Sequence, residues 1–107
     1  MKDEAYETIQ KKLQTFLSSA PRNKDVGITG YVMDMMQHDD SKTAKHIFDA
    51  LDKETYWLYA RDGIWHSESL STSKGMPNSH SKFLEKELGK IGLKSWSKIQ
   101  SEGMPRQ

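Results

Sequence analysis

The stretch that decides the fold is YWLYARDGIWHS, residues 56–67. Its first half is rich in aromatic and apolar residues, Asp62–Gly63 follows, and the apolar pattern returns at Ile64–Trp65. An Asp-Gly pair between two such runs is a strong signal for a two-residue β-turn, so the sequence predicts a two-stranded hairpin. The predicted pairs are Arg61 with Ile64, Ala60 with Trp65 and Tyr59 with His66.

Alternation along the hairpin divides its side chains between two faces. The first face holds Tyr56, Leu58, Ala60 and Trp65. The second face holds Trp57, Tyr59, Arg61, Ile64 and His66. Pairing alone leaves open which of the two faces meets the core.

Residues 41–52, just before the hairpin, have the spacing of an amphipathic helix. The predicted inward stripe is Ala44, Ile47, Phe48 and Leu51. Asp40 or Ser41 suits the N-cap position, because a short side chain with an oxygen accepts a hydrogen bond from a free N–H of the first turn.

A second, shorter helix is predicted over residues 30–37, with Thr29 as its N-cap. We expect Val32, Met33 and Met36 to face inward and Met35 to be more exposed. Val26 and Ile28, which precede this helix, alternate with Asp25 and Gly27 and support only a very short strand.

The first predicted helix covers residues 3–20, with Asp3 suited to the N-cap position and Pro21 ending the helix. Apolar residues recur along it at intervals of three and four, as on one face of a helix. The predicted inward stripe is Ala5, Ile9, Leu13, Phe16, Leu17 and Ala20.

After the hairpin, the composition turns to Ser, Gly and Pro, and a last helix begins at Asn78, Ser79 or Ser81. Gly92 followed by Leu93 predicts a Schellman motif at the end of this helix. We therefore divide the chain into a domain over 3–69, a flexible linker over 70–80, a C-terminal helical extension over 81–100 and a disordered tail over 101–107. Whether the extension packs on the domain is left open.

The composition bounds the fold and the chemistry. A chain of 107 residues with only two Val is expected to form one small domain, mainly α with a small β-hairpin. No apolar run is long enough to span a membrane. The absence of Cys excludes disulfides and thiolate metal sites, and it fits a cytoplasmic protein.

The predicted order of elements, helix, short strand, helix, turn, helix and hairpin, resembles that of a winged helix-turn-helix domain over residues 3–69. Residues 27–29 are similar to the strand and cap that lead into the second helix, 41–51 to a recognition helix, and 61–65 to the tip of a wing. The resemblance is not close to any one subfamily. It implies a DNA-binding regulator of transcription or of a mobile element, whose third helix enters the major groove while the wing touches the backbone. The residues that would then face duplex DNA are Lys42, Thr43, Lys45, His46 and Arg61.

Charge is distributed unevenly along the chain. Residues 1–66 contain nine Lys or Arg against eleven Asp or Glu, whereas residues 67–107 contain seven against four. Because phosphate neutralisation supplies much of the affinity for DNA, we expect basic residues of the second part to assist binding. The assisting residues would be Lys86, Lys90 and Lys94, and the alternative for this part of the chain is an ordinary solvated helix face.

A second hypothesis uses the same fold as a protein-interaction module, because aromatic residues are enriched at the centres of protein interfaces. Trp57 and Tyr59 would form its contact surface. We expect no enzyme activity and no cofactor, because the sequence has no nucleophile elbow and no Gly-rich phosphate loop. We also expect no metal site, since His38 and His46 lie eight positions apart with a turn between them. The oligomeric state is left open.

Overall fold

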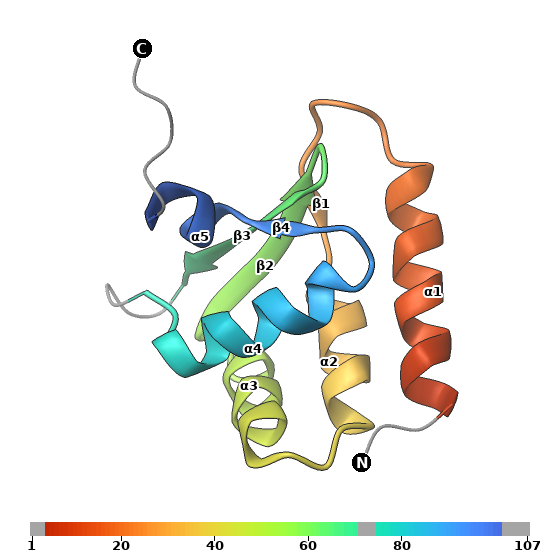
Figure 1. Cartoon of the computed structure of the whole chain (residues 1–107). Coiled ribbons are helices and arrows are strands. Elements are labelled where there is room, and N and C mark those ends of the chain that lie inside the picture. Colours follow the sequence, from red (N-terminus) through yellow and green to blue (C-terminus); the bar gives the residue numbers. More distant parts are fainter. Residues whose placement is uncertain (1–3, 71–74, 102–107) are drawn as a thin grey trace.

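The computed structural model describes residues 4–70 and 75–101, which form a mixed α/β fold (Figure 1). The helices are α1 (Glu4–Ser18), α2 (Thr29–Gln37), α3 (Lys42–Asp52), α4 (Asn78–Gly89) and α5 (Trp96–Ser101). The strands are β1 (Val26–Gly27), β2 (Tyr56–Arg61), β3 (Ile64–Ser69) and β4 (Lys94–Ser95). From α1 to β3 the elements follow the order predicted from the sequence. The predicted cap Asp3, residues 71–74 of the predicted linker and residues 102–107 of the predicted tail lie outside the described residues, whereas Ser101, the first residue of that tail, ends α5.

The sheet is larger than the single two-stranded hairpin that we predicted. Its four strands lie in the order β1-β2-β3-β4, with β2 antiparallel to both neighbours and β4 parallel to β3. β1 and β4 contribute only two residues each. Two residues are too few to show an alternating pattern, so β4 could not be predicted from its own residues.

The predicted hairpin register is confirmed. Arg61 pairs with Ile64, and the pairs beside it also match the prediction. Asp62 and Gly63 both have positive φ, 53° and 82°, as a type I′ turn requires. The local turn chemistry therefore sets which residues lie opposite each other along the whole hairpin.

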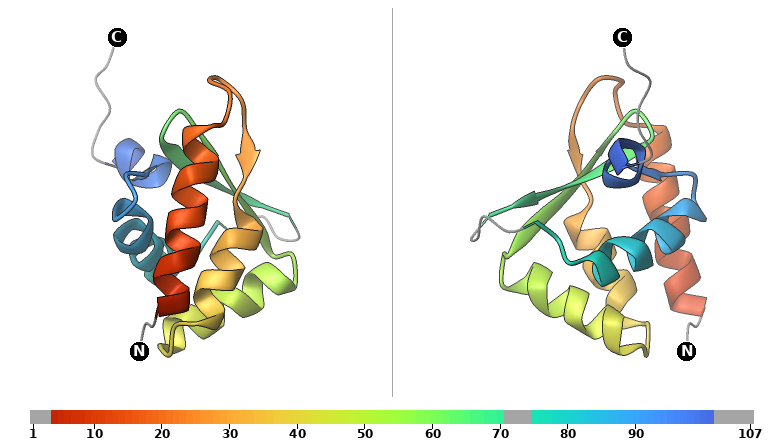
Figure 2. Two further views of the ribbon diagram at one scale, coloured as in Figure 1. Left: turned by 90° about the vertical axis from the view of Figure 1, so that its right-hand side faces the viewer. Right: turned by 60° about the vertical axis from the view of Figure 1, so that its left-hand side comes forward.

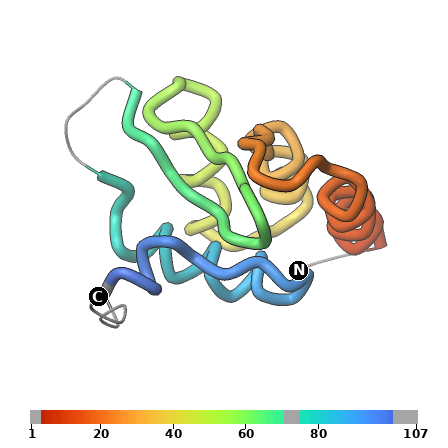
Figure 3. The backbone as a smooth tube through the Cα atoms, turned by 90° about the horizontal axis from the view of Figure 1, so that it is seen from above, coloured from red at the N-terminus to blue at the C-terminus, as the bar shows by residue number. Residues whose placement is uncertain are grey.

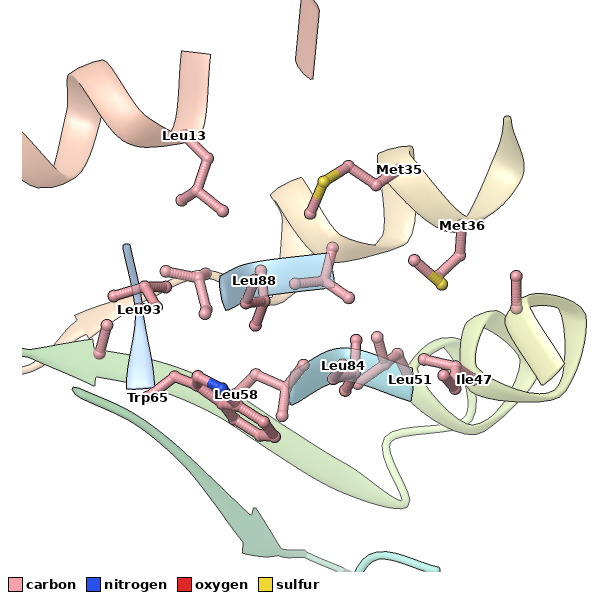
Figure 4. Packing of buried hydrophobic residues seen from close by; sticks show 14 of the residues in the cluster. Leu13, Met35, Met36, Ile47, Leu51, Leu58, Trp65, Leu84, Leu88 and Leu93 are labelled. Carbon is pink, nitrogen blue, oxygen red and sulfur yellow. The ribbon is translucent and has the colours of Figure 1, made fainter. Parts of the chain in front are cut away.

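Helices α1 to α4 lie on one side of the sheet, whereas α5 lies against β3 and β4 (Figure 2). The hairpin face toward α1–α4 is buried, and none of its predicted residues is more than 3% exposed. These residues are Tyr56, Leu58, Ala60 and Trp65. They pack with apolar side chains of all four helices, several of which are labelled in Figure 4.

The prediction for α2 is wrong in two respects. Met35 is fully buried and Met33 is only partly buried, the reverse of what we expected. Thr29 does not cap the helix: its hydroxyl donates to the carbonyl of Leu58 at 3.1 Å and accepts from the N–H of Leu58 at 3.0 Å. Thr29 therefore ties the start of α2 to β2.

The predicted cap of α3 is confirmed, because Ser41 Oγ accepts a hydrogen bond from the N–H of Ala44 at 3.1 Å. On α1, Leu13 is buried as predicted, but Tyr6 is buried as well and the apolar stripe did not include it. The Tyr6 hydroxyl donates to Glu87 Oε1 of α4 at 2.6 Å. A polar partner on a distant helix thus explains the burial of a residue outside the stripe.

The end of α4 has the predicted Schellman motif. Gly92 has φ 94°, the N–H of Leu93 donates to the carbonyl of Leu88, and the N–H of Gly92 donates to that of Gly89. Leu84 and Leu88 are fully buried in the same cluster as the inner hairpin face. Residues of the predicted extension over 81–100 therefore share a core with residues of the predicted domain.

Candidate interaction surface

The second face of the hairpin carries a row of ring side chains on the outer side of the sheet. The row, called the aromatic row below, consists of Trp57 and Tyr59 on β2, His66 on β3 and Trp96 at the start of α5. The rings of Tyr59 and His66 are stacked, with centroids 4.8 Å apart and planes 5° apart. The rings of His66 and Trp96 are 5.4 Å apart and inclined by 32°.

Strand pairing explains how distant parts of the sequence build this row. Tyr59 and His66 lie directly opposite each other in the hairpin, so their side chains share a face. Ser95 of β4 pairs with Trp65, and the next residue along the chain, Trp96, comes to lie beside the ring of His66. The sequence predicted the first two elements of the row, but it did not predict that Trp96 lies beside them.

Gly27 makes room for Trp57. The indole of Trp57 extends from β2 across β1, so that a Cβ atom on Gly27 would lie only 2.5 Å from Cζ2 of the ring. Any residue other than Gly at this position would displace the indole. Trp57 nevertheless remains 40% exposed and is one of the two large apolar side chains that the described part of the chain exposes most.

The imidazole of His66 is held in its neutral form near neutral pH. Partial burial is the main cause that lowers its pKa, and the positive charge of Arg61 lowers it further, although Asp25 acts in the opposite direction. Arg61 and Asp25 form an exposed ion pair with Nε and Oδ1 3.5 Å apart. A neutral ring stacks on Tyr59 without bringing a charge to the middle of the row.

Charges of both signs surround the aromatic row. Lys94 pairs with Ile64, which in turn pairs with Arg61, so these two cations lie on either side of Ile64 at the turn end of the sheet. Glu68 lies opposite Trp57 at the other end. The surface is therefore an aromatic strip with a mixed polar rim.

The predicted DNA-contacting residues do not gather on one surface. Lys42, Lys45 and His46 are exposed on α3, and Thr43 is half-buried there. Arg61 lies at the hairpin turn, at the other end of β2 from α3 (Figures 1 and 2). Lys86, Lys90 and Lys94, which we predicted to assist DNA binding, lie neither on α3 nor at the hairpin turn.

Lys86, Lys90 and Lys94 occupy three different settings. Lys86 is exposed on α4, Lys90 follows the end of that helix, and Lys94 lies in β4. Nζ of Lys90 is 3.2 Å from Oε1 of Glu87, whose side chain is 1% exposed. Lys90 thus compensates a buried carboxylate that also accepts the hydrogen bond of Tyr6.

Glu87 and burial together raise the pKa of the Tyr6 hydroxyl, with burial as the larger cause. In the group formed by Tyr6, Glu87 and Lys90, the carboxylate of Glu87 is buried, and its hydrogen bond with Tyr6 connects α4 with α1. Its role is structural, because the carboxylate already has a hydrogen-bond donor and a cation next to it.

No three His, Asp or Glu side chains within residues 4–70 and 75–101 are arranged to hold a metal ion. Asp39, which follows His38, accepts a hydrogen bond from the N–H of Ser41 at 2.9 Å. Among the same residues, no helix is both long and apolar enough to cross a membrane.

Compared with protein-family models, with curated proteins and with solved structures, the chain shows no significant match.

Proposed function

We propose that this protein is an interaction module that binds a partner protein through the aromatic row on the outer face of its sheet. The observation that carries the proposal is that three separate elements bring Trp57, Tyr59, His66 and Trp96 to the outer face of the sheet, where the rings of Tyr59, His66 and Trp96 lie in contact and Trp57 lies over Gly27. We place this function in the cytoplasm as part of the same proposal, because the chain has no Cys.

The chemistry of the strip fits a protein interface. Aromatic residues are enriched and charged residues are depleted at interface centres, whereas the rim is polar. Here the centre holds neutral rings and the rim holds Arg61, Lys94 and Glu68, which are all exposed. Trp57 combines a large side chain with 40% exposure and a support fixed by Gly27, so it is the expected anchor.

A peptide library displayed on phage tests the proposal. Peptides selected on the intact protein should bind Trp57→Ala at least about tenfold more weakly, since a Trp that anchors an interface typically contributes more than 1.4 kcal/mol to binding. Leu70→Ala is the matched control, because Leu70 is an exposed apolar residue that lies outside the row. The proposal fails if no peptide is enriched, or if enriched peptides bind Trp57→Ala as well as the unmodified protein.

Nucleic-acid binding by a winged-helix DNA regulator is the second candidate. It is supported by the exposure of Lys42, Lys45 and His46 on α3, which follows α2 after a short turn, and by the order of elements from α1 to β3. In this candidate α3 contacts the major groove and Arg61 contacts the backbone.

Fluorescence anisotropy with labelled duplex and single-stranded DNA separates the two candidates. If α3 contacts phosphates, the logarithm of affinity falls linearly with the logarithm of salt concentration. The double variant Lys42→Gln, Lys45→Gln should then lower the slope by about 1.8, and Lys12→Gln, an exposed lysine of α1, should leave it unchanged. Absence of binding at low salt excludes this candidate and leaves the first one standing.

A further inference from the structure

A cavity of about 440 Å³ lies at the end of the molecule that carries the hairpin turn, away from α3. Three segments line it: the end of α1 with the loop that follows, the hairpin turn, and the connection from α4 to β4. Figure 3 looks down on this end, where the three segments lie close together. A volume of this size is typical of sites for small ligands.

The charges at the cavity are mainly positive. Arg22, Lys24 and Arg61 line it, and Asp62 is its one carboxylate among the described residues. Asp62 Oδ1 already accepts a hydrogen bond from the N–H of Asn23 at 3.1 Å. Arg22 and Lys24, by contrast, have no ion pair or hydrogen bond with any residue in 4–70 or 75–101, so their charges are available.

The floor of the cavity is apolar. Its side chains come from α1, β1, β2 and the α4–β4 connection, and they are Leu17, Val26, Ala60, Ile91 and Leu93. Leu93 is 5% exposed and is fixed by the Schellman motif. An apolar floor below a rim of cations suits a ligand that has both an apolar body and an anionic group.

The backbone around the cavity is held in unusual conformations. Five described residues have positive φ, and four of them belong to the segments around the cavity: Asn23, Asp62, Gly63 and Gly92. The hydrogen bond between Asn23 and Asp62 joins two of these segments. This hydrogen bond ties the loop that carries Arg22 and Lys24 to the hairpin turn next to Arg61, and such a tie reduces the cost of ordering the site on binding.

We propose that this cavity binds a small organic anion, whose apolar body lies against Leu17 and Ile91 and whose carboxylate or phosphate group is bound by Arg22 and Lys24. The site is separate from the aromatic row: Arg61, which lines the cavity, is the one residue that also belongs to the rim of the row.

Isothermal titration calorimetry at low salt with naphthalene-2-carboxylate tests the proposal on the full chain. The neutral carboxamide of the same shape, and inorganic phosphate alone, should each bind at least about tenfold more weakly, because one lacks the charge and the other lacks the apolar body. Equal affinity for the carboxylate and the carboxamide would overturn the proposal, as would absence of binding by the carboxylate.

Substitutions of the two cations show whether the carboxylate binds in the cavity. The double variant Arg22→Gln, Lys24→Gln should bind the carboxylate at least about tenfold more weakly, whereas Lys12→Gln, an exposed and unpaired lysine of α1, should bind it normally. Trp57→Ala should also bind normally, so failure of the interaction proposal and failure of this one are distinguishable. If Trp57→Ala abolishes carboxylate binding and the double variant does not, the anion binds at the aromatic row and the cavity proposal is wrong.

Discussion

Trp65 and Trp57 lie on opposite faces of the same hairpin, and one is 2% exposed while the other is 40% exposed. On the inner face, Trp65 packs against side chains from α1–α4 as part of the core. On the outer face, Trp57 rests over Gly27 and is open to solvent. Alternation therefore assigns a residue to a face, whereas the helices decide which face provides stability and which is available for binding.

Removal of α4, which covers part of the inner hairpin face, should have the largest effect on stability. A fragment of residues 1–70 lacks Leu84 and Leu88, which are fully buried in the shared core. We expect this fragment to be unfolded, because a small domain has little stability to lose and each buried Leu contributes about 2 kcal/mol or more. Circular dichroism of the fragment measures this. A cooperative melting transition for the fragment would instead support the independent domain over residues 3–69 that the sequence predicts.

The two Trp side chains should contribute very differently to stability. Trp65→Ala should lower the free energy of unfolding by about 3–5 kcal/mol, because it opens a cavity in the core. Trp57→Ala should lower it by less than about 1 kcal/mol, because this side chain is largely solvated. Urea denaturation of the two variants gives both values. Similar losses in the two variants would mean that the outer face is part of the core.

Gly27→Ala examines how the outer face is built. The new methyl group would approach the indole of Trp57 to within 2.5 Å, so the ring must move while the backbone remains allowed. We expect large NMR shifts of the Trp57 indole N–H and a smaller change in stability than Trp65→Ala causes. Gly30→Ala is the control, because no atom lies within 4 Å of its added methyl group. An unmoved Trp57 indole signal in Gly27→Ala would contradict the packing of Trp57 on β1.

The smallest effect expected is a dependence of stability on pH, to which both faces contribute. Burial lowers the pKa of His66 on the outer face and of His80, whose Nδ1 is hydrogen-bonded to the hydroxyl of Tyr56 at 3.0 Å. Because both values lie below the ordinary 6.5, the unfolded chain takes up protons first as the pH falls. The contribution of the two His residues to the free energy of unfolding should therefore be fully present above pH 6.5 and should decrease as the pH falls below it.

Urea denaturation at several pH values between neutral and mildly acidic conditions measures this dependence. The double variant His66→Gln, His80→Gln should show a flatter profile over the same range. A profile as steep as that of the unmodified protein would assign the dependence to other groups.

Sequence patterns correctly predicted the features that depend on residues close together in the chain. Turn chemistry at Asp62–Gly63 was sufficient for the hairpin register, and Ser41 and Gly92 marked the ends of helices. On α2, Met35 lies three positions after Val32 and Met33 lies three positions before Met36, so either fits one helical stripe, and the choice between them depends on where the neighbouring helices lie. A nine-residue helix is too short for its own sequence to decide this.

Only part of the candidate surface could be predicted, because the rest of it depends on how distant elements pack. Trp57 and Tyr59 followed from alternation, and their exposure could be known only once the helices were placed. Trp96 and Gly27 join the surface through β4 and β1, which are each two residues long. Alternation around Val26 predicted a short strand there, but the partners of β1 and β4 in the sheet depend on tertiary packing and could not be predicted from the sequence.

The hydrogen bond between Tyr6 and Glu87 can form only late in the synthesis of the protein. Eighty-one positions separate the two residues, so a ribosome synthesises Tyr6 long before its acceptor exists. The hairpin, whose paired residues are near neighbours in the chain, can form during that interval, but its apolar face waits for α4. In newly made chains the apolar face of the sheet is therefore covered only in part, by α1–α3, until α4 has been synthesised and has packed against it.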